Sequence, residues 1–234
     1  MNAKLLIIAL LLNTQAISAK IRIVLTAALT QAHYEFRKNE YIESFTSLKR
    51  FGYCDFYIVE AVTKGGPTFL DTYCNDVFYA TANDPLCTNQ GVNESKTMLE
   101  ALRYFNFDPD DMIIKLTGRH RLISDYFIKL VENNPDYDVF VKVCQDLMPA
   151  WEDGMIPSMC FAMRCKYLQE MYEEIDYETM IEDNSQIERE IAYYLFRQAQ
   201  TGTLKVYVTD TLDIRMNAFA SSAAPGQPEK IYIF

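Results

Sequence analysis

The stretch Ile21 to Leu29 reads IRIVLTAAL and decides the fold expected for this chain. Its β-branched and apolar residues are typical of a strand that is buried on both faces of a sheet. The amphipathic stretch His33 to Phe51 follows and stops at Gly52, which is the pattern of a helix with a C-terminal glycine. The folded part of the chain therefore begins as a strand followed by a helix.

The same alternation continues along the chain. Further strands are predicted at Phe56 to Val62, Val77 to Ala80, Met112 to Leu116, Asp138 to Val143, Ile156 to Met163 and Leu204 to Val208. Further helices are predicted at Gly91 to Phe105, Ser124 to Glu132, Lys166 to Glu174 and Ser185 to Gln200. This alternation predicts an α/β fold: a mainly parallel, Rossmann-like sheet with helices on both faces.

The composition indicates how many domains the chain forms and which partners it can bind. Half of the 234 residues are apolar, which is enough for one substantial core, and no composition shift marks a boundary within residues 20–234. Acidic side chains exceed basic ones by ten, whereas binding to a nucleic-acid backbone needs a broad basic surface. We expect a single domain over residues 20–234, no nucleic-acid partner, and only a local anion site.

Residues 1–19, MNAKLLIIALLLNTQAISA, form a hydrophobic leader. The apolar run Leu5 to Leu12 follows Lys4 and precedes a polar stretch that ends in small residues, as in a secretory signal peptide. The run is shorter than the roughly 20 apolar residues of a membrane-spanning helix. The leader predicts export or a secretory-pathway lumen, and its alternatives are a retained membrane anchor and a buried element of the domain.

Six cysteines follow the leader: Cys54, Cys74, Cys87, Cys144, Cys160 and Cys165. An even count suits an oxidising compartment, but no CxxC pair is present and the large apolar fraction removes the need for disulfide bonds. Disulfides and buried free thiols both remain open.

A basic cluster stands out against the acidic composition in IIKLTGRHRL, residues 113–122. Lys115 lies inside an otherwise apolar strand, where an unpaired ammonium is unfavourable and needs a specific partner. Thr117 to Arg121 follow at the carboxyl end of that strand, where ligands bind in open parallel α/β sheets. The cluster therefore occupies the position expected of a ligand site.

The chemistry of this cluster suits a diphosphate. Lys115 supplies a point charge, Arg119 supplies a planar fork that matches phosphate oxygens, and Gly118 lets the backbone turn sharply and approach a ligand. The alternative is that Arg119 and Arg121 are solvated loop charges that pair with acids such as Asp125, an arrangement of little energetic weight.

These residues resemble a family of nucleotide-sugar glycosyltransferases with the GT-A fold, whose members carry a K-x-T-G-R-Y element. The element reads here Lys115-Leu116-Thr117-Gly118-Arg119-His120, with His120 in place of the usual tyrosine, a change that bears on substrate choice. The resemblance covers residues 21–145, and Glu40 is one of the residues that carry it. It implies a donor site formed by Thr26, Ala27, Arg37, Glu60, Asn89, Gly91, Glu94, Lys115, Thr117, Gly118 and Arg119.

Most GT-A enzymes hold a divalent metal with an Asp-x-Asp at the end of the equivalent strand, and this chain has none there. The nearest matches, Asp108-Pro109-Asp110 and Asp136-Tyr137-Asp138, precede predicted strands and are interpreted as turn and cap residues. Preorganised cations can neutralise a leaving diphosphate in place of a metal. The resemblance therefore implies no metal and no cofactor besides the sugar nucleotide, with Lys115, Arg119 and Arg37 at the leaving group.

An inverting transfer needs a carboxylate to take the acceptor's proton, and the segment MIEDNSQIERE, residues 180–190, contains the candidates. Glu182 and Asp183 resemble the Glu-Asp pair that precedes an acceptor-side helix in many inverting GT-A enzymes. The resemblance implies Asp183 as the base, with Glu182 second.

Structural and catalytic alternatives to this assignment remain open. Ser185 to Glu188 has the pattern of a capping box, and acids near a helix start are favoured by its dipole. Asp146 and Glu152 follow a later strand and are further candidates for the base, and Trp151 beside them could stack on a sugar ring.

The resemblance implies a hexosyltransferase-like enzyme that moves a sugar from a nucleotide-diphosphate donor to a glycan, lipid or protein acceptor. The alternative is a non-catalytic carbohydrate- or nucleotide-binding module on the same fold. Because nucleotide sugars occur in the cytosol and in eukaryotic secretory lumens, the leader implies an ER- or Golgi-like lumen, or membrane association through residues 1–19.

Overall fold

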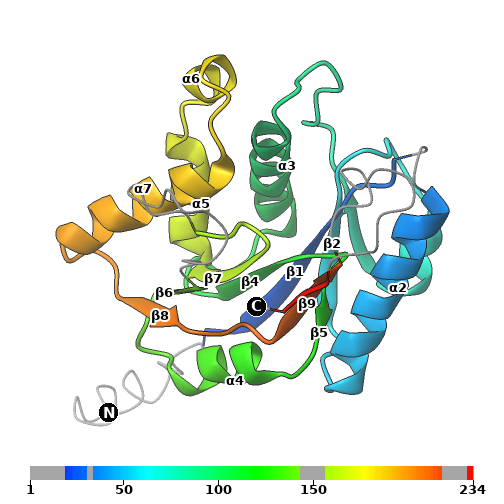
Figure 1. The fold of residues 1–234 in the computed structure, drawn as a ribbon, viewed down its shortest axis with the longest axis horizontal. Helices are drawn as coiled ribbons and strands as arrows, with labels where there is room; N and C mark the ends of the chain where they lie inside the picture. Colours follow the sequence, from blue (N-terminus) through cyan, green and yellow to red (C-terminus); the bar gives the residue numbers. More distant parts are fainter. Residues whose placement is uncertain (1–18, 31–33, 143–155, 218–230, 234) are drawn as a thin grey trace, which may run out of the picture.

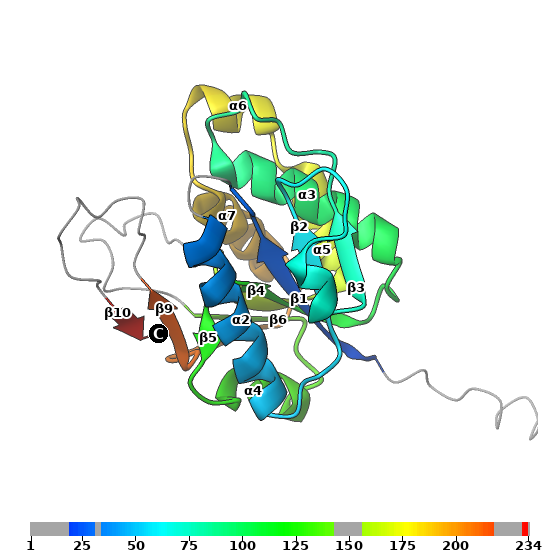
Figure 2. The ribbon, with the colours of Figure 1, turned by 90° about the vertical axis from the view of Figure 1, so that its right-hand side faces the viewer.

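The computed structural model describes residues 19–30, 34–142, 156–217 and 231–233. The described residues form a seven-stranded sheet in the order β3-β2-β1-β4-β7-β6-β8, with helices on both faces (Figures 1 and 2). Neighbouring strands are parallel except for β7, which is antiparallel to both β4 and β6. The predicted α/β fold class, a mainly parallel sheet covered on both faces, is confirmed.

The strands of this sheet are β1 (Ile21–Ala27), β2 (Phe56–Glu60), β3 (Asp76–Tyr79), β4 (Met112–Thr117), β6 (Val139–Lys142), β7 (Cys160–Arg164) and β8 (Val206–Thr209). The helices are α2 (Tyr34–Arg50), η2 (Phe69–Thr72), α3 (Gln90–Phe105), α4 (Tyr126–Asn133), α5 (Cys165–Glu174), α6 (Tyr177–Glu182) and α7 (Ile187–Gln200). A smaller antiparallel sheet contains β5 (Arg121–Leu122), β9 (Ile214–Asn217) and β10 (Ile231–Ile233). The predicted elements are present with ends shifted by a few residues, whereas η2, α6 and the small sheet do not follow from the sequence pattern.

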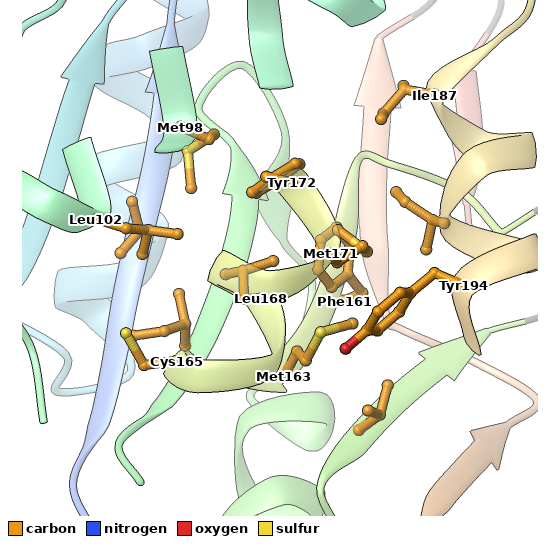
Figure 3. Close-up of a cluster of buried hydrophobic side chains, with 14 of the residues drawn as sticks. Met98, Leu102, Phe161, Met163, Cys165, Leu168, Met171, Tyr172, Ile187 and Tyr194 are labelled. Atoms are coloured by element: carbon orange, nitrogen blue, oxygen red, sulfur yellow. The ribbon is translucent and has the colours of Figure 1, made fainter. Parts of the chain in front are cut away.

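Two hydrophobic cores lie on opposite faces of the sheet. One core joins the sheet to α2, α4 and the small sheet, and it includes Leu25, Phe45, Ile58, Phe127 and Ile214. The other joins the sheet to α3, α5, α6 and α7. Figure 3 shows its centre, where the following side chains meet: Met98, Leu102, Phe161, Met163, Leu168, Met171, Tyr172 and Tyr194. Successive residues of β1 supply both cores, because adjacent side chains of a strand point to opposite faces.

The carboxyl ends of three parallel strands meet at one edge of the sheet. Thr26 of β1 is in register with Thr117 of β4, and Ala27 is in register with Glu60 at the end of β2. Because β7 is antiparallel, the residues that precede it lie at the same edge, and the Thr117 amide donates to the Met159 carbonyl at 2.7 Å. Four chain segments therefore converge where ligands bind in sheets of this class.

The structure describes five of the six cysteines and only the last residue of the predicted leader. The described cysteines, Cys54, Cys74, Cys87, Cys160 and Cys165, are free thiols, while Cys144 lies outside the described residues. The predicted leader also lies outside them, apart from residue 19. Within the described ranges, none of the helices has the length and apolar character needed to cross a bilayer.

Phe45 tests the first core. It is fully buried and stacks against Phe56 with ring centroids 5.5 Å apart. We expect Phe45→Ala to lower the free energy of unfolding by about 3–5 kcal/mol, because the substitution leaves a cavity. Urea unfolding would measure this, and Phe196→Ala is the control, since Phe196 is 65% exposed and its loss should change stability by less than about 0.5 kcal/mol. Equal effects of the two variants would contradict the assignment of this core.

Candidate functional site

Glu60 organises two of the converging loops. Its side chain is fully buried at the end of β2. The carboxylate accepts hydrogen bonds from the backbone N–H groups of Leu29 at 3.1 Å, Val62 at 2.9 Å and Thr63 at 2.8 Å. A buried carboxylate requires such donors. Glu60 therefore holds the loop after β1 against the loop after β2.

Gly118 brings the loop after β4 against β1. Its amide donates to the Thr26 carbonyl at 2.8 Å. A Cβ at this position would lie 2.9 Å from that oxygen and 3.1 Å from the Tyr41 ring. A side chain would therefore push the loop away from β1, and with it Arg119. The close approach expected of this glycine is made to the protein's own backbone and to a tyrosine.

Arg37, Arg119 and Tyr41 lie at the carboxyl end of β1. Arg37 donates from Nη1 to the Ala28 carbonyl at 2.7 Å, and the Ala28 amide donates to the Tyr41 hydroxyl at 2.7 Å. Arg119 Nη1 lies 4.0 Å from Glu40 Oε2, and its side chain is 19% exposed. Burial raises the pKa of Tyr41 to about 12, and the charges of Arg119 and Arg37 both oppose that rise. Arg37 and the Tyr41 hydroxyl are thus linked through Ala28 at the carboxyl end of β1, and the charges of Arg37 and Arg119 both act on that hydroxyl.

Lys115 has the specific partners that its burial requires. Its side chain is completely buried, and its ammonium pairs with the Glu94 carboxylate, donates to the Ser158 carbonyl and lies 3.3 Å from Thr117 Oγ1. An ammonium has three N–H donors. A phosphate could contact Lys115 only by replacing one of these partners.

Asn89 and Gly91 connect α3 to α6 and α7. Asn89 caps α3, and its Nδ2 donates to the carbonyls of Met180 at 3.1 Å and Ser185 at 2.9 Å. A Cβ on Gly91 would lie 3.0 Å from Cβ of Ile187, so a glycine lets α3 and α7 pack closely. These two residues of the predicted donor site therefore join helices in this structure. Glu94, also from α3, is paired with Lys115 of β4.

The predicted base residues lie at the end of α6. Glu182 is its last residue and Asp183 is its C-cap, and both are exposed. Within the described residues, neither side chain has a hydrogen bond or an ion pair with the end of β4. Asp146, Trp151 and Glu152 lie outside the described residues.

The capping box predicted for Ser185 to Glu188 is wrong. The N-cap of α7 is Gln186, so Glu188 occupies the second helical position instead of the third, and the Gln186 side chain makes no capping hydrogen bond. Ser185 Oγ bonds Glu190 Oε1 at 3.2 Å, whereas Glu188 Oε1 accepts from Ser158 Oγ at 2.6 Å. The sequence pattern predicted a capping role for Glu188. The structure instead places its carboxylate against Ser158, at the carboxyl edge of the sheet.

Of the two Asp-x-Asp matches, Asp108 has the turn role that was predicted, whereas Asp138 joins neighbouring strands. Asp108 Oδ1 accepts from the Asp110 amide at 3.0 Å, just before β4. Asp138 precedes β6, where it bonds Arg164 Nε and the Lys205 amide, each at 3.0 Å. Among the residues that the structure describes, no group of three or more His, Cys, Asp or Glu side chains could hold a metal ion.

His120, which replaces the family tyrosine, is buried beside the cations. Its side chain is 5% exposed, and its Nδ1 has no hydrogen-bond partner among the described residues. Burial lowers the pKa of His120 to about 3, and the charges of Arg119 and Lys115 contribute to that shift. The imidazole is therefore neutral at physiological pH.

Arg121, the first residue of β5, pairs with Glu43 at 3.6 Å, whereas Asp125 pairs with Lys129 at 2.7 Å. The partner suggested for the arginines from the sequence, Asp125, is therefore taken by another residue. Arg121 follows the pattern of a surface ion pair, in contrast to Arg119, whose side chain is largely buried.

Comparisons with known proteins identify no family. No family model and no curated protein match the chain. A glycosyltransferase involved in the glycosylation of the major capsid of PBCV-1 is similar in structure, with a TM-score of 0.49 and 11% identity over 83% of this chain and 85% of that chain. Mouse xyloside xylosyltransferase 1 in its apo form gives a TM-score of 0.46 and 9% identity over 82% and 85%. At these values the likeness carries no argument about function, which depends on the chain's own residues.

Gly118→Ala tests the close approach between the loop and β1. The added Cβ meets a backbone oxygen that cannot rotate away, so we expect the free energy of unfolding to fall by about 1–3 kcal/mol. Chemical unfolding measures the change. Gly202→Asn is the control, because Gly202 has a φ of +71°, which asparagine tolerates, and a Cβ there would meet no atom within 4 Å. A Gly118→Ala variant as stable as the native protein would contradict the contact.

His120 predicts a pH dependence of stability. The folded protein keeps the imidazole neutral down to a pKa of about 3, whereas the unfolded chain binds a proton below about 6.5. Unfolding therefore takes up a proton between these values, and stability falls as the pH falls through this window. Between pH 7 and pH 5 we expect the native protein to lose about 2 kcal/mol more than His120→Phe, measured by urea unfolding. Equal losses would show that the imidazole is protonated in the folded state.

Proposed function

We propose that this chain is a GT-A-like glycosyltransferase that moves a sugar from a nucleotide-diphosphate donor to a hydroxyl of a glycan, lipid or protein. The observation that carries the proposal is the placement of two guanidinium groups at the carboxyl end of β1: Arg37 bonds the Ala28 carbonyl, and Arg119 follows Gly118, whose amide bonds the Thr26 carbonyl. This is the ligand-binding edge of open parallel α/β sheets, and guanidinium forks match the oxygens of a diphosphate.

The leaving group defines the role of each cation. As the bond to the anomeric carbon breaks, negative charge develops on the diphosphate, and preorganised donors in a partly buried site stabilise it. Arg119 contacts the diphosphate directly, and Arg37 fixes the loop after β1 and adds a second positive charge. Lys115 positions the strand end through Glu94 and Ser158. This division of roles supports a reaction that needs no metal.

A non-catalytic module that binds carbohydrate or nucleotide is the second candidate. The observation that favours it is the position of Glu182 and Asp183, which are exposed and make no bond to the end of β4 within the described residues. The proposal for the enzyme also places it in an ER- or Golgi-like lumen, where nucleotide sugars are supplied, with residues 1–19 as the export signal or anchor.

Arg119 provides the test. We expect the protein to bind one member of a panel of UDP- and GDP-hexoses in calorimetry and to release the nucleoside diphosphate at the same rate with and without EDTA. Arg119→Ala should lower kcat/KM by about 10²–10³-fold, the range found when one charge-stabilising donor is removed. Arg103→Ala is the matched control, because Arg103 is 61% exposed and pairs with Glu173 on the surface.

The outcomes separate the alternatives. Loss of activity in EDTA would contradict the metal-independent reaction. Donor binding without turnover, across donors and acceptors, would support the binding module. Full binding and turnover in Arg119→Ala would remove Arg119 from the site, and a lowered melting temperature with unchanged donor affinity would give it a purely structural role.

A further inference from the structure

A carboxylate that the sequence did not single out lies at the carboxyl edge of the sheet. Glu188 Oε1 accepts a hydrogen bond from Ser158 Oγ at 2.6 Å. The carbonyl of the same serine accepts from the buried Lys115 ammonium, and the next residue, Met159, accepts from the Thr117 amide at 2.7 Å. Glu188 is therefore linked to β4 through Ser158 and Met159. The last residue of β4, Thr117, lies two residues before Arg119 in the chain.

Glu188 is held in place by two contacts. Its side chain is fixed by Ser158, and its carbonyl accepts from the Ile156 amide at 3.2 Å. Both contacts come from the segment that leads into β7, which the Lys115 ammonium anchors. A general base requires such preorganisation, because proton transfer depends on hydrogen-bond distance before it depends on acidity.

The other candidate acids are less suited to the role. Glu60 is fully buried and saturated by backbone amides, and Glu94 is paired with Lys115. Glu182 and Asp183 are exposed. Glu188 is only partly buried, and among the described residues its hydrogen bond is made through Oε1, which leaves Oε2 for a substrate hydroxyl.

We infer that Glu188 is the general base of the proposed transferase, and this inference rests on that proposed function. The acceptor oxygen forms a bond with the anomeric carbon while the bond from that carbon to the diphosphate oxygen breaks. The electron pair of the broken bond leaves with the nucleoside diphosphate, whose charge faces Arg119. The acceptor proton passes to Oε2 of Glu188, and the reaction inverts the anomeric configuration.

The test uses the full chain and the UDP- or GDP-hexose that binds in the donor screen, with water as the acceptor. We expect Glu188→Gln to keep the donor Kd within about twofold and to lower kcat for nucleoside diphosphate release by about 10²–10⁴-fold. The acid limb of the pH profile of kcat should disappear in this variant. Ser158→Ala, which keeps the carboxylate and removes its hydrogen bond, should lose about tenfold in kcat.

The matched control is Glu190→Gln, which removes a carboxylate from the same helix and should leave kcat unchanged. Glu188→Gln with native kcat, or with lost donor binding and a lowered melting temperature, would overturn the inference. Loss of turnover in Asp183→Asn alone would return the role of base to the end of α6. Retention of configuration in the released sugar, observed by NMR before it equilibrates, would also overturn it. Absence of donor binding and release in the native protein would instead refute the proposed function itself.

Discussion

The buried charge of Lys115 is the constraint on which the rest of this edge of the sheet depends. An ammonium that is completely removed from water must be paired and hydrogen-bonded, because its desolvation otherwise destabilises the folded state. Glu94 meets this need from α3, and the Ser158 carbonyl meets it from the segment before β7. One charge therefore ties a central strand to a helix and to the neighbouring antiparallel strand.

Backbone groups complete the arrangement at the same edge. The Glu60 carboxylate gathers amides from the loops after β1 and β2, and the amide of Gly118 bonds the end of β1 directly. These contacts are made by main-chain groups or by one fully buried side chain, so they hold the loops after β1, β2 and β4, the last of which carries Arg119, without using the Arg119 guanidinium. A rigid frame with a few convergent polar groups is the usual form of a small-molecule site.

The predictable part of the site is local in the sequence. The strands follow from runs of β-branched and apolar residues, and the order of strand and helix by itself places Thr117 to Arg121 at the ligand edge. Strand β5 and the position of Glu188 could not be predicted, because each depends on contacts that the local sequence does not show. The strand β5 has two residues, too few for a periodic signal, and its partner β9 is far away in the chain. Glu188 is the other case, since a start of α7 at Ser185 would have made it a capping residue.

The sequence by itself determined the α/β class, the lysine in an apolar strand and the positions of the arginines that follow, because these depend on periodicity and on the order of residues. It also required that Lys115 have a partner, since an isolated buried charge is unfavourable in any fold. Only the tertiary structure decided that the partner is Glu94, that Gly118 meets Thr26 and Tyr41, and that Glu188 reaches Ser158. Those contacts join residues far apart in the chain, and their identity depends on helix packing and side-chain direction, which no local pattern encodes.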